Sequence, residues 1–301
     1  MKEDSLLSKR NIRLIEIAEE IALNGPTDIG FVCRSMVSAS MPHSKPIGFQ
    51  YKRSSNNFTI AIVGNEAAGG IPYGTYPRLI LSWLASEIVR TGSREIILGQ
   101  SLSDFMKRLG LSVTGGRWGT INRFRDQLRK LFAAHISFSY EDRKLGKWIH
   151  ASMNIADSSQ IFWDPKNPNQ IDLFKSKVVV GESFFNEILK SPIPVDIRAI
   201  NALKESSLAL DIYFWATYRM SYLSSPIDLS FDKLQMQFGA GYNDTRQGKY
   251  EFKRKFLVQL KKVMTLYPKA KISITEGGLK LYPSPSHVSK KSVSSKEYQG
   301  V

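Results

Sequence analysis

The chain has a single cysteine and no long apolar run. Cys33 has no second cysteine with which to form an internal disulfide, a pattern that is usual in a reducing cytoplasm. The longest nearly uncharged stretch, 80–89, contains Glu87 and falls short of the roughly 20 residues that span a bilayer. The first ten residues mix both signs of charge and lack the apolar core of a secretory signal. We therefore expect a cytoplasmic protein with no membrane association.

Residues that bind metals or nucleotides are also scarce. The four histidines form no His-x-His or His-x-x-x-His pair; they are His43, His135, His150 and His287. The segment 241–250 differs from a phosphate-binding loop, because six residues separate its glycines and Tyr250 stands where a magnesium-binding Ser or Thr is needed. The sequence therefore predicts no cofactor, no metal site and no enzymatic activity. A nuclease or primase with an unfamiliar active site remains an alternative.

Acidic residues are few relative to basic ones. The chain has 27 Asp and Glu against 42 Lys and Arg, which gives a net charge of +15 and a pI near 9.7. The rest of the composition, with 42% hydrophobic residues and a mean hydropathy of -0.22, is that of a folded globular protein. A length of 301 residues is enough for about two domains. Nucleic acid is therefore the first class of partner to consider.

The two ends of the chain differ from its middle. Apolar residues recur at helical spacing over 5–23, before the helix-ending sequence Asn24-Gly25-Pro26. Short strands are expected at 31–33, 48–51 and 58–63, separated by clusters of Pro, Ser and Asn. The last residues, 284–301, are rich in Ser and Lys, have no apolar pattern and are expected to be disordered.

A repeat is the most informative feature of the remaining sequence. Each copy has, in order, an apolar helix around a tryptophan, a short strand, a short helix ending at a glycine, a turn, a long helix and two strands. The elements expected in the first copy are helix 76–91 around Trp83, strand 95–98, helices 101–109 and 117–133, strand 136–140 and a strand from 148 onward. Those expected in the second copy are a helix around Trp215, strand 227–229, helices 231–238 and 249–266, and strands 271–275 and 279–282. The long helices superpose with a constant offset of 132 residues, which pairs Trp118 with Tyr250 and Arg123 with Lys255.

This order of elements is that of a winged helix-turn-helix, in which one helix enters the major groove of DNA. We therefore expect an α+β protein with two tandem winged-helix domains and a β-rich N-terminal segment. The expected limits are 1–70 for the N-terminal segment, 71–190 and 191–283 for the two winged-helix domains, and 284–301 for the disordered tail. The two central tryptophans are expected to pack in the cores.

The two long helices separate apolar from basic residues at about 100° per residue. Trp118 and Tyr250 are grouped with the apolar residues, and the opposite side is polar or basic in both copies. The candidate DNA-binding residues are Arg117, Asn122, Arg123, Arg129 and Lys130 in the first copy, Arg143, Lys144 and Lys147 at a basic wing tip, and Lys249, Arg254, Lys255, Lys261 and Lys262 in the second copy. Their donors suit the phosphates and base edges of double-stranded DNA. For either helix taken alone, a solvated basic face that binds nothing is the alternative.

Three segments are long and specific enough to compare with known families. They are Gly70-Ile71-Pro72-Tyr73-Gly74-Thr75-Tyr76-Pro77-Arg78-Leu79-Ile80-Leu81-Ser82-Trp83, Ser101-Leu102-Ser103-Asp104-Phe105-Met106-Lys107-Arg108-Leu109-Gly110-Leu111 and Gly115-Gly116-Arg117. These segments resemble the plasmid-encoded RepA family of replication initiators, and the resemblance extends over roughly residues 25–285.

The resemblance implies a plasmid replication initiator that binds repeated sites in double-stranded origin DNA. It further implies that the protein helps to open the duplex and recruits host replication proteins such as a helicase or the host initiator. A homodimer held together by residues 1–63 is left open. So is a purely regulatory repressor, which would bind an operator without melting it.

Overall fold

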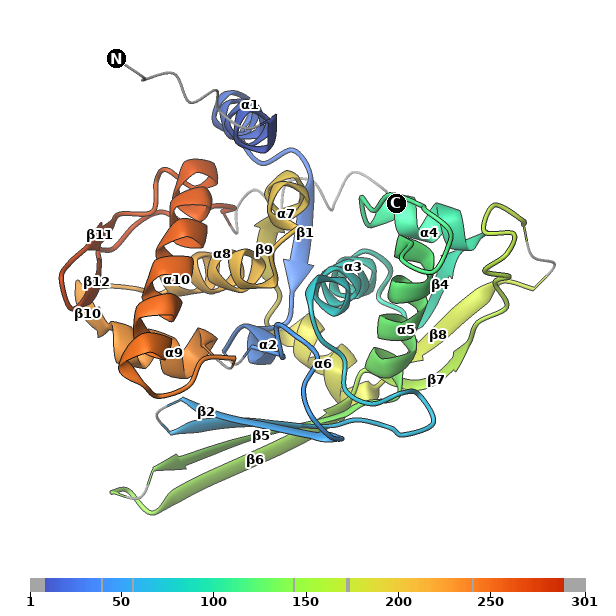
Figure 1. Ribbon diagram of the computed structural model, residues 1–301, viewed down its shortest axis with the longest axis horizontal. Helices are drawn as coiled ribbons and strands as arrows, with labels where there is room; N and C mark the ends of the chain where they lie inside the picture. Colours follow the sequence, from blue (N-terminus) through green and yellow to red (C-terminus); the bar gives the residue numbers. More distant parts are fainter. Residues whose placement is uncertain are drawn as a thin grey trace. The chain divides into compact units, whose positions relative to one another are not determined.

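The computed structural model describes residues 9–38, 40–55, 57–142, 144–171, 174–239 and 241–289, and it is a mixed α+β structure (Figure 1). Its contacts divide the chain into two compact units. Unit 1 comprises the described residues up to Gly30, Pro194–Leu234 and those from Tyr242 onward, and unit 2 comprises Phe31–Ile193 and Gln235–Gly241. The chain passes between the units within or beside three elements, which are β1 (Ile29–Val32), β9 (Ile193–Asp196) and α9 (Phe231–Phe238).

Unit 2 is built around the apolar helix α3 (Thr75–Thr91). This helix ends at Gly92, whose left-handed backbone (φ 62°) lets its N–H bond to the carbonyl of Ile88. Trp83 is half-buried and stands edge-on to Phe105, with 4.8 Å between the ring centroids. The other helices described in this unit are α2 (Arg34–Ser38), α4 (Leu102–Arg108), α5 (Thr120–Phe132) and α6 (Glu182–Lys190), and α5 and α6 pack against α3.

Two antiparallel sheets belong to unit 2. The first has the strand order β2-β3-β5-β6, formed by β2 (Gln50–Ser55), β3 (Phe58–Val63), β5 (His135–Asp142) and β6 (Lys147–Asn154). The second has the order β4-β8-β7, formed by β4 (Glu95–Gly99), β7 (Ala156–Gln160) and β8 (Ser176–Val180). Strands of the N-terminal segment therefore share a sheet with the strands that follow α5.

The hairpin β5–β6 does not occupy the place that the sequence predicts for the wing of the first repeat. In the second repeat, the strand before the two helices pairs with the last strand of the repeat. The same arrangement in the first repeat would pair β4 with β6, but β4 pairs with β8 instead. The buried side chains of β5 explain the difference, because Ile136 and Phe138 lie opposite Ile62 and Ile60 of β3 and complete an apolar layer with them. The sequence does not predict the strand β7, because apolar and polar residues do not alternate over 156–160.

Unit 1 is arranged around the buried helix α8 (Ser207–Met220), which contains Trp215 in the core as expected. The helices α7 (Ile197–Leu203) and α10 (Arg246–Leu266) pack on α8, and α1 (Lys9–Asn24) packs on α7 and α10. An antiparallel sheet of order β10-β12-β11 belongs to the same unit; its strands are β10 (Ile227–Ser230), β11 (Ile272–Ile274) and β12 (Gly278–Leu281). The long helix α10 packs along α8, and its Lys253 donates to the carbonyl of Glu276 in the turn between β11 and β12 (Figure 1).

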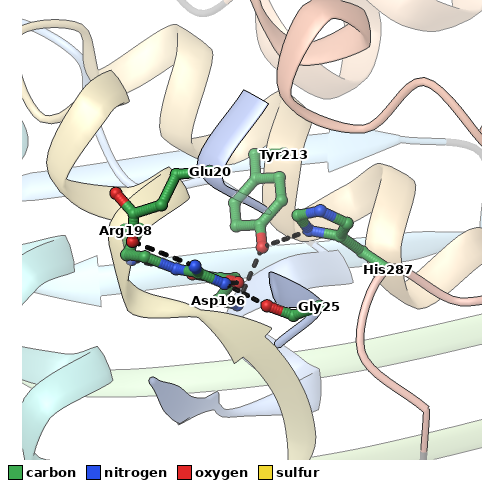
Figure 2. A network of polar contacts seen from close by, with 6 residues as sticks. All are labelled: Glu20, Gly25, Asp196, Arg198, Tyr213 and His287. Atoms are coloured by element: carbon green, nitrogen blue, oxygen red, sulfur yellow. Dashed lines mark hydrogen bonds and ion pairs between the residues drawn. The ribbon is translucent and has the colours of Figure 1, made fainter. Parts of the chain in front are cut away.

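A polar network centred on Arg198 fixes the start of α7. The Asp196 carboxylate caps the helix by accepting the N–H of Arg198 at 2.9 Å, and it also binds the Arg198 guanidinium at 2.6 Å (Figure 2). The same guanidinium contacts Glu20 at 3.1 Å and donates to the carbonyl of Gly25. The network therefore ties the end of α1 to α7, and we assign it a structural role.

The described chain ends in a packed segment, so the expectation of disorder from residue 284 is wrong for 284–289. Val288 is fully buried, and the His287 ring stacks on Tyr267 with 4.6 Å between centroids. The Tyr213 hydroxyl accepts the N–H of Asp196 and lies 2.8 Å from Nδ1 of His287 (Figure 2). Burial lowers the pKa of His287 to about 4, so the ring is neutral near pH 7. Residues 290–301 lie outside the described chain.

Most of the helices and strands expected from the sequence are present. The expected strand 58–63 and helix 231–238 coincide with β3 and α9, whereas α5 begins three residues later than expected and α10 three residues earlier. Residues 1–70 do not form a contact unit of their own, because α1 belongs to unit 1 and β2 and β3 belong to unit 2. The limits at 71 and 191 remain a proposal from the repeat.

Candidate nucleic-acid interface

Helix α5 buries one side in unit 2 and exposes the other. Phe124 and Leu128 are buried, and the Phe124 ring stands edge-on to Phe105 at 5.6 Å between centroids. The predicted DNA-binding residues that are exposed on this helix are Asn122, Arg123 and Arg129. The predicted separation of apolar and basic residues is therefore present in α5.

The loop before α5 holds Arg117 and Trp118 away from the core. Each of Thr114 and Thr120 donates its backbone N–H to the hydroxyl of the other at 3.0 Å, which closes the loop. A Cβ at Gly119 would lie 2.3 Å from the carbonyl oxygen of Thr114, so only glycine fits this turn. The two side chains are thus presented by a pinned loop.

The placement of Trp118 and Tyr250 with the apolar residues is wrong. The exposed fraction is 81% for Trp118 and 62% for Tyr250. Trp118 lies in the loop two residues before α5 begins, so the helical periodicity does not extend to it. Tyr250 lies within α10, four residues before the exposed Arg254, and shares the solvent side of that helix.

Lys130 is also placed differently from the prediction. Its side chain is 5% exposed, its Nζ contacts the Asp126 carboxylate at 2.7 Å, and it lies 5.4 Å from the centroid of the Tyr73 ring. A Cβ at Gly69 would lie 3.2 Å from Cε of Lys130, so the loop before α3 covers the lysine stem. Lys130 therefore belongs to the core of unit 2 and not to a DNA-facing surface.

Helix α10 repeats the arrangement of α5 in unit 1. Its buried side includes Phe252, Phe256, Leu260 and Val263. Of the predicted residues, Arg254, Lys255 and Lys261 are exposed and Lys262 is half-buried. The Lys255 ammonium lies 5.4 Å from the centroid of the Tyr242 ring, a contact that leaves the lysine at the surface.

Lys249 is held by two carboxylates. Its Nζ lies 2.9 Å from Asp232 on α9 and 3.1 Å from Asp244 in the loop before α10. The hydrogen bond with Asp232, followed by that with Asp244, raises the pKa of Lys249. The charge of Lys249 is therefore compensated within unit 1, where its side chain joins α9 to α10.

The predicted wing-tip residues lie on the β5–β6 hairpin. Lys144 and Lys147 are exposed there, and Asp142 accepts the backbone N–H of Lys144 at 3.0 Å to form the turn. Arg143 lies outside the described residues. The strands paired with β4 in this unit are β8 and, beyond it, β7, and the sequence does not predict either of them.

The end of α4 carries two exposed cations that are not among the candidates from the sequence. Lys107 and Arg108 are exposed, and Arg108 forms an ion pair with Asp104 at 2.9 Å. Between Asp104 and Asp126 the chain has no acidic residue, although it has cations there in α4, in the loop and in α5. This gap in acidic residues is the signal in the sequence for the exposed cations of this segment.

No group of three or more His, Cys, Asp or Glu side chains in the described ranges is arranged to hold a metal ion. Within those same ranges, none of the helices combines the length and the apolar character needed to cross a membrane.

Comparison with known proteins identifies the class of the chain. Residues 71–230, more than half of the 301, match the family described as plasmid encoded RepA protein. The chain belongs to this family, and it is therefore a replication initiator of the RepA type. The match begins at the start of the first repeat and runs to β10 in the second.

A solved structure resembles this one in outline. It is the crystal structure of selenomethionine derivatives of domains 2 and 3 of RctB, which has 11% sequence identity to this chain and a TM-score of 0.49. The similarity covers 83% of this chain and 98% of the RctB chain. A search of curated proteins finds no match.

Proposed function

We propose that the chain is an origin-binding protein with two winged-helix modules, one formed by α3, β4, α4, α5, β7 and β8 and the other by α8, β10, α9, α10, β11 and β12. The observation that carries the proposal is the shared sheet order. In β4-β8-β7 and in β10-β12-β11, the strand that precedes the helix pair lies beside the last strand of the hairpin. Since both modules also share the order of their helices, they have the topology of one repeated fold.

In each module the second helix of the pair is the one proposed to enter the major groove. Its apolar side is buried in its own unit, and its solvent side bears basic and amide groups that reach phosphates and base edges. Arg123 and Arg129 in α5, and Lys255 and Lys261 in α10, are the exposed cations proposed for phosphate contacts. Lys130 and Lys249 are left out because their charges are paired.

The two modules are proposed to recognise unequal half-sites. Asn122 of α5 corresponds to Arg254 of α10, and these side chains prefer adenine and guanine respectively. The favoured DNA is therefore a direct repeat unit without a palindrome. The full proposal is a plasmid initiator that binds such repeats, promotes duplex opening and recruits host replication proteins, with no catalytic step of its own.

Footprinting on a single repeat, combined with mass measurement of the complex, tests the tandem arrangement. The test DNA is a direct repeat found beside the gene. One bound chain is expected to protect about two helical turns, because successive major grooves on one face of the duplex are about 10 base pairs apart. A protected stretch of only about one turn per chain would mean that one of the two helices stays outside the groove.

Paired substitutions test the two helices separately. Arg123→Ala with Arg129→Ala, and Lys255→Ala with Lys261→Ala, are expected to weaken binding and to reduce the dependence of affinity on salt, since each lost phosphate contact lowers the slope by about 1. Exposed charges change stability by about 0.5 kcal/mol at most, so the melting temperatures should stay unchanged. Normal affinity in both double variants would contradict the assignment.

Permanganate footprinting separates an initiator from a repressor. An initiator is expected to make thymines in an AT-rich segment beside the repeats reactive, because the bases unpair there. A protein that protects the repeats and leaves every neighbouring thymine unreactive is a repressor, and the opening step of the proposal would then be abandoned.

A further inference from the structure

Two aromatic rings are exposed at equivalent positions of the two repeats. The Arg117 guanidinium lies 5.4 Å from the centroid of the Trp118 ring, which is 81% exposed. Tyr250 is on the solvent side of α10, close to its start. Large rings left in water forgo the free energy of burial, so an exposed ring near the start of each long helix favours a ligand that covers both rings.

Each ring lies near the start of the helix that is proposed to enter the groove. Trp118 is in the loop two residues before α5, whose exposed polar residues are Asn122, Arg123 and Arg129. Tyr250 is the fifth residue of α10 and is followed on the same side, four and eleven residues later, by the exposed Arg254 and Lys261. Both rings are therefore close to the N-terminal part of a proposed groove helix, where such helices make their base contacts.

The charge around the rings favours a polyanion over an apolar protein partner. No carboxylate occurs between Asp104 and Asp126, so the exposed cations around Trp118 have no acidic neighbour within that segment. Over residues 246–254, α10 contains Arg246, Lys253, Arg254 and the paired Lys249 against the single acidic residue Glu251. A hydrophobic protein surface gains nothing from this surplus of positive charge, whereas the DNA backbone does.

We propose that Trp118 and Tyr250 each receive the 5-methyl group of a thymine in the major groove. This inference rests on the proposed function. The methyl group is the apolar feature that the major groove presents, and the other base-edge atoms there are hydrogen-bond donors and acceptors. Each module thus requires a thymine at a defined position, in addition to the base read by Asn122 or Arg254.

Selection from a library of randomised 30-base-pair duplexes supplies the probe. The full chain is expected to enrich a motif with one fixed thymine in each half-site. Each fixed thymine is then replaced by deoxyuridine, which lacks only the methyl group. The wild-type affinity is expected to fall about fourfold at each, the factor that burial of one methyl-sized group provides.

The variants connect each thymine to one ring. In Trp118→Ala the affinity penalty for deoxyuridine is expected to disappear in one half-site and to persist in the other. In Tyr250→Ala the penalty is expected to disappear in the second half-site and to persist in the first. Trp118→Phe retains an apolar ring and should restore the penalty. Trp148→Ala is the matched control, because Trp148 is an exposed indole on β6, outside both groove helices, and should leave both penalties unchanged.

The outcomes distinguish this inference from the function on which it rests. Equal deoxyuridine penalties in the wild type and in both alanine variants, with unchanged melting temperatures, overturn the thymine contacts and leave sequence-specific binding intact. A motif that contains no fixed thymine does the same. If the wild-type chain enriches no motif, the proposed function fails and the inference fails with it.

Discussion

Neighbouring residues Arg129 and Lys130 provide a sharp test of the structure, because both are basic and both are candidates from the sequence. Arg129 is exposed on α5, whereas Lys130 is buried and paired with Asp126. Arg129→Ala should therefore change stability by about 0.5 kcal/mol at most and lower the salt slope of DNA binding by about 1. Lys130→Ala should lower the stability and leave the salt slope of DNA binding unchanged.

The cost of Lys130→Ala follows from what the side chain contacts. The substitution removes three buried methylene groups, at about 0.8 kcal/mol each, and so costs about 2 kcal/mol from packing. The ion pair adds little, because the Asp126 side chain is half-exposed and regains water when its partner is removed. A loss of about 2 kcal/mol lowers the Tm by about 4–8 °C in a unit of this size.

Thermal melting and DNA titration on the same preparations check this pair. Lys130→Met is the control, because it keeps an apolar stem of similar length and should recover most of the stability lost in Lys130→Ala. DNA affinity measured well below the Tm should match the wild type in both Lys130 variants. If Lys130→Ala melts like the wild type and loses as much DNA affinity as Arg129→Ala, then Lys130 faces the DNA and the reasoning is refuted.

Three further predictions concern the loop, the buried histidine and the absence of cofactors. Thr114→Val should weaken DNA binding more than it lowers stability, because it removes the hydroxyl that accepts the N–H of Thr120; affinity and Tm measured together show which changes more. The unfolding free energy should fall as the pH drops from about 6.5 to about 4, because the unfolded chain protonates His287 in this window and the folded chain does not; urea titrations should show a shallower fall for His287→Phe. Site-specific binding should be unchanged by EDTA or by added nucleotide, and a nucleotide-dependent gain in affinity would show that the segment 241–250 was misjudged.

The sequence by itself determined most of the helices, though not α2, α6 or α7, most of the strands and the existence of the repeat. Periodic apolar residues make the positions of α3, α5, α8 and α10 evident, since a helix with one buried side must repeat its apolar residues every three to four positions. The same regularity separated Arg123 and Arg129 from the core side of α5. The RepA motifs were equally readable, because they are continuous stretches of sequence that need no tertiary contact to be recognised.

Only the tertiary structure decided which strands pair and which cations are free. Strand pairing depends on which buried side chains complete a common layer, so β5 joins β3 through Ile136 and Phe138, and the pairing of β4 passes to β8. The surroundings of a basic residue depend on loops distant in sequence, and for this reason Lys130 is covered by the loop before α3. A residue's position on a helix predicts the direction of its side chain. Whether that side chain contacts water, protein or DNA depends on how segments distant in sequence pack around it.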